Sequence, residues 1–383
     1  MIQAIVMLAL AAANCGITQR IVEPMLPQLA DEFSTSVSAA AIIITAFAFA
    51  SAAAQYLYGP LGHRYGALRT VTVLCALSAL SSFGCAAANS LEAMAAWRFA
   101  CGVFASGSMT LGMTYVADVV APERRQFMLA RFLAGSVSGQ TLGPFVGGAL
   151  TDLLGWRSTF VVLGLIFLAV AAALFRTTRS AWGPHRPAER ALLSPALYLD
   201  ILKRPRARGV LFFVFCEMAL FFGAYSFLGV LLRERFDLSF TLVGLIIAGF
   251  GVGGLIFSSL VRILLARFGQ RGCVLLGGTL GGSLYLAILV VPNWPLAMLC
   301  TVGMGFSFYA MHNTLQTKAT EMAPQSRASA LALFSMHWAA GQAVGALAMS
   351  VGAHWIGYPR MIALFGCGFI LLGLAFRQRL NRL

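Results

Sequence analysis

The sequence predicts an all-α polytopic membrane protein with twelve transmembrane helices, arranged as two pseudo-symmetric six-helix bundles. Three observations predict this fold class: the composition, the recurrence of long apolar runs, and a repeat that relates the two halves. Of the 383 residues, 59% are hydrophobic and only 10% are charged, against about 25% charged residues in a typical soluble domain. This composition excludes an ordinary water-soluble protein, and its apolar content excludes a disordered chain.

Each predicted span is an apolar run close to the ~20 residues that a helix needs to cross the hydrocarbon core. The runs are too long for strands and lack the strict alternation of a membrane β-barrel. No basic segment precedes the first run, so we expect it to remain as an anchor rather than to be cleaved as a signal peptide. The predicted spans are 2–28, 37–58, 68–88, 91–117, 127–150, 157–176, 209–232, 239–264, 272–291, 294–317, 328–350 and 360–376.

The positive charges lie mainly on one side of the proposed membrane. With the N-terminus inside, 21 of the 27 Lys and Arg residues fall in cytoplasmic segments, four fall outside and two lie within spans. This bias fits twelve spans with both termini in the cytoplasm, and we expect a bacterial cytoplasmic (inner) membrane. The net charge of +14 therefore reflects topology, and no nucleic-acid partner is expected.

The two halves of the sequence repeat at a nearly constant offset. Gly139-Gln140 matches Gly341-Gln342, and Gly155-Trp156 matches Gly357-Tyr358, both 202 residues later. The repeat predicts an N-terminal six-helix bundle at 1–176, a basic cytoplasmic linker at 177–208 and a C-terminal six-helix bundle at 209–383. A duplicated bundle of this kind places its binding site between the halves, near the middle of the membrane.

Three short motifs lie in the first half of this layout. One is the loop between the second and third spans, one is Arg98 with Gly102 in the fourth span, and one is a glycine ridge in the fifth span. Glycines at every fourth position form a smooth helix face that another backbone can approach, and Pro144 permits a kink. The loop and ridge residues are Gly59, Leu61, His63, Arg64, Gly66, Arg69, Gly139, Gly143, Pro144, Gly147 and Gly148.

With the six-plus-six layout and the basic central linker, these motifs make the whole chain resemble the major facilitator superfamily. The fifth-span motif is similar to the Gly-x-x-x-Gly-Pro-x-x-Gly-Gly pattern of its drug/proton antiporters. The loop motif resembles Gly-x-Leu-x-Asp-Arg-x-Gly, but His63 stands where the family has the aspartate of a conformational latch. His63 is either a solvated loop histidine or a group that titrates near neutral pH.

Four charged residues within or at the edge of spans are the candidates for handling protons or charge. Arg98 is expected to face the bundle interior, where the resemblance implies a link to proton transfer, or else to extend to the outer interface. Arg20 and Glu23 are three residues apart and can pair, so Glu23 either binds a proton or cationic substrate or only neutralises Arg20. Glu217 lies about 9 Å along its helix and is either a buried proton carrier or a carboxylate bonded to helix neighbours.

Other polar residues in the apolar runs are candidates for the substrate cavity. In dry spans such side chains usually form hydrogen bonds between helices, and this reading stays open for each of them. His312 is either a proton relay or a packed histidine. The cavity candidates are Asn14, Tyr115, Gln140, Tyr225, His312, Asn313, His337 and Gln342.

The sequence contains no enzyme motif, no P-loop and no Cys or His cluster with metal spacing. We therefore expect no enzymatic activity, no metal and no cofactor, with the proton gradient as the energy source. The resemblance implies a monomeric secondary transporter in the lipid bilayer that exports a small organic molecule, a drug or metabolite, in exchange for protons. The alternatives are uptake or exchange of an organic anion, with Arg20 and Arg98 as anion partners, and a membrane sensor or scaffold without flux.

Overall fold

The computed structural model describes residues 2–179, 195–323 and 327–382, and within these ranges the chain is helical, without strands. Residues 180–194 of the predicted linker, and 324–326 of the repeat, lie outside the described residues. The first half contains α1 (Ile2–Arg20), α2 (Leu26–Glu32), α3 (Val37–Ala40), α4 (Ile42–Tyr65), α5 (Ala67–Ala86), α6 (Leu91–Ala105), α7 (Gly107–Val119), α8 (Pro122–Leu154) and α9 (Trp156–Thr178).

The second half repeats this order after one short helix. In it, α13 contains two spans that meet at Gly269, where φ is 62° and ψ is 179°. The elements are α10 (Pro195–Lys203), α11 (Pro205–Tyr225), α12 (Leu228–Phe236), α13 (Phe240–Ala287), α14 (Trp294–Glu321), α15 (Arg327–Ile356), α16 (Tyr358–Arg379) and a 3-10 helix, η3 (Leu380–Arg382).

The twelve predicted helices are confirmed, although their bounds differ. Nine stretches of the described chain are long and apolar enough to cross a membrane, and the undivided α13 counts as one of them. Dividing α13 and adding α1 and α8 gives twelve. The predicted first span of 2–28 is too long, because α1 ends at Arg20 and a turn separates it from α2. Glu23 precedes Pro24 in that turn, and the residue before a proline is disfavoured in a helix.

Four glycines with positive φ confirm the repeat in the backbone. Gly66 and Gly155 join consecutive helices in the first half, with φ of 85° and 81°. Gly269 and Gly357 stand 203 and 202 residues later, with φ of 62° and 84°. Glycine reaches these conformations without the steric cost that a Cβ atom imposes, so the two halves turn at the same places by the same means.

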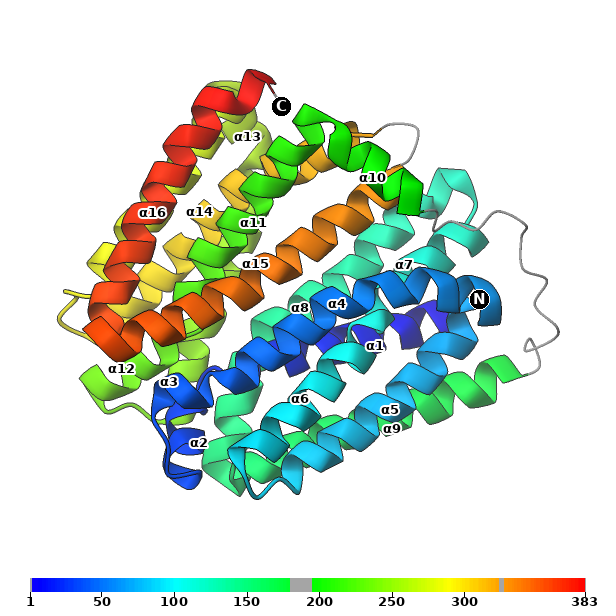
Figure 1. The fold of residues 1–383 in the computed structure, drawn as a ribbon, viewed down its shortest axis with the longest axis horizontal. Helices are drawn as coiled ribbons and strands as arrows, with labels where there is room; N and C mark the ends of the chain where they lie inside the picture. Colours follow the sequence, from blue (N-terminus) through cyan, green and yellow to red (C-terminus); the bar gives the residue numbers. More distant parts are fainter. Residues whose placement is uncertain (1, 180–194, 324–326, 383) are drawn as a thin grey trace.

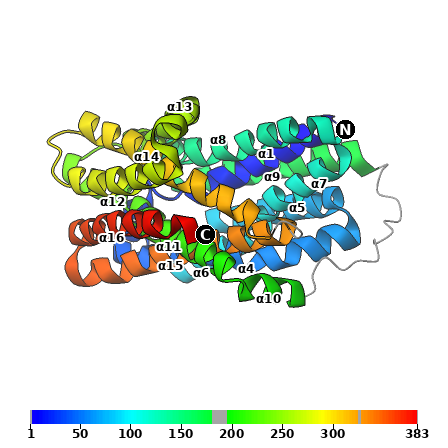
Figure 2. The same cartoon turned by 90° about the horizontal axis from the view of Figure 1, so that it is seen from above.

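The two six-helix bundles meet along two seams, α8 against α13 and α4 against α15. Figure 1 shows α4 beside α15 in the middle of the molecule, and α2, α3 and α12 close together at the lower left. We call this end, opposite the chain termini, the distal end. Figure 2 shows α8 and α13 on one face of the molecule and α4 and α15 on the other.

The glycine ridge of α8 packs against α1 inside the first bundle. The ridge glycines at 135, 139 and 143 face carbonyl groups of α1, and a Cβ atom on Gly143 would lie 3.0 Å from the Ile17 carbonyl oxygen. In the second bundle Gly341 and Gly345 face carbonyls of α11 in the same way. Close approach of backbones is the purpose that such small residues serve in membrane helices. The facing pairs in α8 and α1 are Gly135 with Ala9, Gly139 with Ala13 and Gly143 with Ile17, and Gly147 faces Ile21 directly after α1.

Candidate functional site

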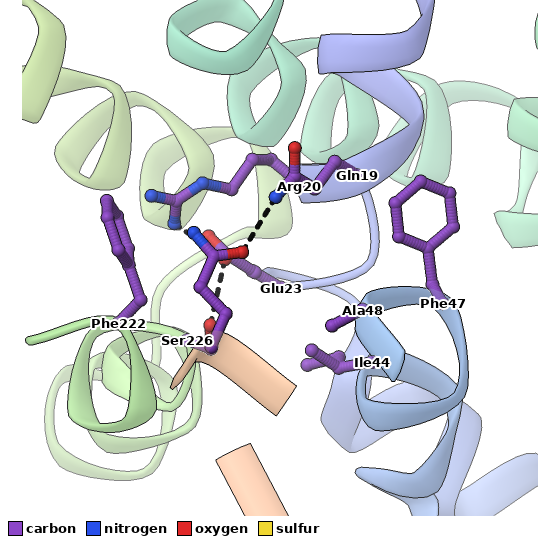
Figure 3. A pocket seen from close by; sticks show the side chains of 9 residues that line it. Gln19, Arg20, Glu23, Ile44, Phe47, Ala48, Phe222 and Ser226 are labelled. Atoms are coloured by element: carbon purple, nitrogen blue, oxygen red, sulfur yellow. Dashed lines mark hydrogen bonds and ion pairs between the residues drawn. The ribbon is translucent and has the colours of Figure 1, made fainter. Parts of the chain in front are cut away.

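A small cavity lies between the two bundles, towards the distal end (Figure 3). Its volume is about 20 Å³, which exceeds the roughly 10–15 Å³ that one water requires. It is too small for an organic molecule. The cavity is lined by Gln19, Arg20, Glu23, Ile44, Phe47, Ala48, Phe222, Ser226 and Gln342.

An ion pair between Arg20 and Glu23 forms one wall of this cavity. Because α1 ends at Arg20, the following turn brings Glu23 back so that Arg20 Nη1 lies 2.7 Å from Glu23 Oε1. Arg20 is 5% exposed and Glu23 is 2% exposed. The pair that the spacing allowed is therefore present, and it is almost completely removed from bulk water.

The surroundings of the ion pair come from both bundles. The Arg20 guanidinium carbon lies 4.2 Å from the ring centre of Phe222 and 5.3 Å from that of Tyr225, which gives cation–π attraction from the second bundle. Ser226 donates a 3.1 Å hydrogen bond to Glu23 Oε1, while Glu23 Oε2 is buried without a hydrogen-bond partner among the described residues. One carboxylate oxygen is therefore left for a proton, a water or a ligand group.

A second polar contact crosses between the bundles beside the ion pair. The Gln19 amide nitrogen donates to Gln342 Oε1 at 2.8 Å. Gln342 is one of the residues that the sequence placed in the cavity, and the structure puts it on the cavity wall. Its partner Gln19 and the neighbouring Ser226 were not selected from the sequence. The repeat offers a signal for Ser226, which stands 203 residues after Glu23.

Arg98 is enclosed within the first bundle and is 0% exposed, so it does not extend to the membrane interface. Its Nη1 donates to the Thr18 carbonyl at 2.9 Å and its Nε to the Ile43 carbonyl at 3.4 Å. The guanidinium carbon lies 4.4 Å from the ring centre of Phe47. Nη2 is buried without a hydrogen-bond partner among the described residues. Arg98 thus ties α1 to α4, and its proposed part in proton transfer stays a prediction.

The second bundle contains a buried carboxylate–imidazole pair. Glu217 on α11 and His312 on α14 were separate candidates in the sequence, and the structure places Glu217 Oε2 2.7 Å from His312 Nδ1. Glu217 is 0% exposed and His312 is 8% exposed. The imidazole stacks on Phe308 with ring centres 4.9 Å apart. Either group can hold the proton between these two atoms, and Glu217 Oε1 has no partner in the described chain.

Three other candidates bind backbone carbonyls within their own bundle. The Asn14 amide donates to the Leu163 carbonyl of α9 at 3.3 Å. The Tyr225 hydroxyl donates to the Ile247 carbonyl at 2.6 Å. His337 Nδ1 donates to the Leu333 carbonyl one turn earlier in its own helix, at 2.8 Å. These contacts tie helices together or complete a helix turn. The Tyr225 ring also lies 5.3 Å from the guanidinium carbon of Arg20 beside the cavity, whereas Asn14 and His337 are not on the cavity wall.

The remaining cavity candidates are partly buried. Tyr115 packs against apolar clusters of the first bundle. Gln140 lies against Gly16 of α1, so it belongs to the contact between α8 and α1. Asn313 follows His312 and is partly buried, and its carbonyl accepts a hydrogen bond from Thr317. None of the three is on the wall of the small cavity.

The loop motif between α4 and α5 forms a tight helix-to-helix turn at Gly66. The Thr70 hydroxyl binds the carbonyls of Leu61 at 3.2 Å and Gly66 at 2.9 Å, which closes the turn. His63 is partly buried, while Arg64 and Arg69 are exposed. This geometry explains the part that Leu61 and Gly66 play in forming the turn. A titrating role for His63 stays a prediction.

The structure also shows a contact between the bundles that the sequence reasoning missed. Asp152, near the end of α8, accepts hydrogen bonds from the Thr241 amide at 2.7 Å, the Thr241 hydroxyl at 2.6 Å and the Phe240 amide at 3.2 Å. In the sequence, the available signal for Asp152 was its position one helical turn after Gly148 of the glycine motif.

The described residues contain no group of three or more Cys, His, Asp or Glu arranged to hold a metal ion.

Comparisons with known proteins agree with this architecture. An uncharacterized MFS-type transporter of Bacillus subtilis (strain 168), YceJ, is 27% identical over 334 residues, covering 85% of this chain and 83% of the relative. The inner membrane transport protein YnfM of Escherichia coli (strain K12) is 24% identical over 367 residues, covering 94% and 87%. The crystal structure of a bacterial homologue of the human lysosomal transporter Spinster, in an inward-facing and unoccupied conformation, superposes with a TM-score of 0.80 at 16% identity, covering 99% and 96%.

That structural likeness shows the fold, and the family is shown by the sequence itself. Residues 8–240 and 210–381 each match the Major Facilitator Superfamily. Because these two ranges together span nearly the whole chain, the protein belongs to the major facilitator superfamily of membrane transporters.

Proposed function

We propose that the protein is a proton-coupled secondary transporter that exports a small organic molecule, a drug or metabolite, by alternating access. The observation that supports proton coupling is the Glu217–His312 pair, with 2.7 Å between carboxylate oxygen and imidazole nitrogen inside an apolar bundle. A buried carboxylate without a fixed cation in contact is costly to ionise. The neighbouring imidazole can share or accept its proton, so the pair can load and release a proton.

The contacts between the bundles support an inward-facing state under the predicted topology. Several hydrogen bonds join the two halves towards the distal end, as in Gln19 with Gln342, Ser226 with Glu23 and Asp152 with Thr241. With both termini in the cytoplasm, as the positive charges favour, the distal end faces outward and is closed. The bundles would then part on the cytoplasmic side, from which an exporter takes its substrate.

Export itself rests on the α8 motif, whose resemblance to the drug/proton antiporters was drawn from Gly139, Gly143, Pro144 and the glycine pair that follows. The aromatic residues around the cavity and the Glu217–His312 pair favour an amphipathic molecule. For localisation we propose a bacterial cytoplasmic (inner) membrane, consistent with the description of YnfM as an inner membrane protein.

A second candidate function is uptake of an organic anion together with a proton. The observation that favours it is the Arg20 guanidinium, which is surrounded by aromatic rings and neutralised by only one Glu23 oxygen. If Glu23 takes up a proton, Arg20 loses its internal counter-ion and can bind a substrate carboxylate. Proton and anion would then bind together, which gives symport and not exchange.

Proteoliposomes with a trapped pH indicator test the proposed function, after a ligand thermal-shift screen has identified a compound that binds. We expect that compound to drive proton movement through the wild-type protein, and Glu217→Gln to abolish this coupling while ligand binding persists. His312→Gln should have the same effect. His337→Gln is the matched control, because His337 binds only a carbonyl of its own helix, and it should retain coupling.

Each outcome decides between the candidates. Unchanged proton coupling in Glu217→Gln would remove the pair as the proton site. Proton movement in the same direction as an anionic compound would favour the uptake candidate. Binding without flux of any compound would identify a sensor or scaffold instead of a transporter.

A further inference from the structure

The first amide groups of α13 depend on a residue from the other bundle. A helix leaves its first four N–H groups without partners inside the helix. Here Ser239 accepts from the Leu242 amide with its side chain and from the Val243 amide with its carbonyl. The Phe240 and Thr241 amides donate to Asp152 on α8. The Phe240 and Thr241 amides at the start of α13 therefore have these partners only while α8 lies against it.

Glycines on both helices allow α8 and α13 to approach this closely. Gly148 of α8 faces the Phe240 carbonyl, and Gly244 of α13 faces the Pro144 carbonyl. A Cβ atom at either position would collide with the opposing backbone. Gly148, the last glycine of the α8 motif, thus serves the seam between bundles, whereas Gly143 and Gly147 pack against the first segment of the chain. Close packing brings the Asp152 carboxylate within reach of the α13 amides.

The opposite seam, α4 against α15, has no equivalent charge. Ser38 stands 203 residues before Thr241. The Ser350 hydroxyl donates to the Ser38 carbonyl, and the Tyr358 hydroxyl lies 3.1 Å from the Ser38 hydroxyl. The position 202 residues after Asp152 is His354, which is exposed. Neutral hydroxyl contacts therefore close this seam, whereas a carboxylate at a positive helix terminus closes the other.

We propose that Asp152 is a gating residue that holds the distal side closed by capping α13 across the seam between the bundles. When the bundles part at this end, the Phe240 and Thr241 amides lose their hydrogen bonds to the Asp152 carboxylate. Both the amides and the carboxylate must then form hydrogen bonds with water instead. The interaction of a carboxylate with a helix terminus is favourable even at a surface, so opening works against this contact. The proposal relies on alternating access but not on proton coupling or on the direction of transport.

Hydrogen exchange of the purified full-length protein, measured by mass spectrometry, tests the proposal. The two reporters are residues 240–252 at the capped seam and residues 37–52 at the opposite seam. In Asp152→Ala we expect exchange to accelerate roughly 2- to 30-fold at both reporters, the range typical of losing a helix cap. Asp152→Asn keeps an acceptor oxygen but not the charge, and should fall between wild type and Asp152→Ala.

Ser350→Ala is the matched control, because it removes a neutral hydroxyl contact from the other seam. It should change exchange less than Asp152→Ala and mainly near residues 37–40. Exchange within residues 70–85 of α5, which packs inside the first bundle against α9, reports global loosening and should stay as in wild type. If this reporter rises too, Asp152→Glu, which retains the carboxylate, should restore protection at both seams.

Acceleration confined to the first residues of α13, with residues 37–52 unchanged, would overturn the proposal and leave Asp152 as a local cap. Failure of Asp152→Glu to restore protection would overturn it as well. Because the measurement needs no substrate and no pH gradient, its result is separate from the fate of the proposed transport function.

Discussion

The first bundle ties α1 to α4 through one buried guanidinium. Arg98 donates to the carbonyls of Thr18 on α1 and Ile43 on α4. No carboxylate neutralises it among the contacts that the described residues make, and one of its nitrogens is unpaired within that part of the chain. The charge is therefore retained in an apolar bundle at a cost of about 2.5–3.5 kcal/mol by insertion scales.

In the second bundle, two neutral hydroxyl groups on different helices bind the equivalent carbonyls. The corresponding carbonyls, 203 residues later, belong to Phe221 and Ile246. Tyr285 donates to the first and Thr301 to the second, each at 2.6 Å. Thr301 also stands 203 residues after the arginine of the first bundle. The same two backbone groups are thus satisfied in both halves, by a cation in one and by hydroxyls in the other.

This difference distinguishes the structural role of Arg98, which is to bind the two carbonyls, from the role of its charge. Providing a hydrogen-bond donor to these two carbonyls does not require a charge, because hydroxyl groups do so in the second bundle. A costly charge that the packing does not require points to a role in transport. The ionisable pair of the second bundle is elsewhere: Glu217 binds His312, while the position 203 residues before Glu217 is the neutral Asn14, which donates to a carbonyl.

The strongest test of this difference between the bundles is to remove the charge of Arg98. We expect Arg98→Gln to reduce substrate flux in proteoliposomes to background while the protein still folds, because the amide can bind one of the two carbonyls but has no charge. Thr301→Val should cost about 0.5–1.5 kcal/mol of stability for one lost hydrogen bond and retain most of the flux. Flux and thermal unfolding in detergent are the two measurements.

Arg98→Lys keeps the charge but only one compact donor group, and should retain part of the flux. Equal flux in Arg98→Gln and Thr301→Val would contradict the comparison, because the arginine would then be only a helix tie.

Much of the fold could be predicted from the sequence because its determinants are local. Apolar runs gave the helices, and the offset between Gly155 and Gly357 gave the repeat that their matching φ values confirm. The end of α1 was missed because a run of apolar residues continues past Pro24, and only the turn geometry shows that Arg20 and Glu23 lie beside the second bundle.

The site was less predictable because its contacts join distant parts of the chain. Glu217 and His312 were each recognised as polar residues in apolar spans, but 95 residues separate them and no periodicity indicates that they touch. Asp152 is an exposed residue at a helix end, which is where aspartate is ordinary. Its role emerges only when the start of α13 is seen against it.

The helix turns offer a test of the symmetry itself. Gly155 and Gly357 have nearly the same φ, and a Cβ atom at either would meet no atom closer than 3.8 Å. Both have ψ near 160°, an extended positive-φ conformation that is essentially restricted to glycine. Replacing either by alanine should therefore cost only this backbone strain, about 1–3 kcal/mol. We expect the two losses, measured by denaturant or thermal unfolding in detergent, to agree within about 0.5 kcal/mol.

Asparagine tolerates the αL region but not an extended conformation with positive φ, so Gly155→Asn and Gly357→Asn should each lose about as much stability as the alanine variant. A large loss at only one of the two turns would show that the bundles differ in stability where their backbones are alike.

The smallest expected effect concerns an exposed pair at the distal end. Arg157 Nη1 lies 2.7 Å from Glu32 Oε1, and this hydrogen bond from the guanidinium lowers the pKa of the Glu32 carboxyl below its usual value. The position 203 residues after Glu32 is Arg235, which donates to the carbonyl of Ile288. The equivalent position therefore has an acid in one half and a base in the other.

A lowered pKa in the folded state means that the pair stabilises the protein above the unfolded carboxyl pKa, and that this contribution disappears as the pH falls through the folded value. Because both side chains are substantially exposed, we expect Glu32→Gln to cost no more than about 1 kcal/mol at pH 7 and low salt. The cost should vanish in acid, whereas substitution of Arg235 should show no such dependence, since a backbone carbonyl does not titrate. A Glu32→Gln penalty that persists unchanged in acid would mean that packing around the side chain, and not its charge, stabilises the distal end of the first bundle.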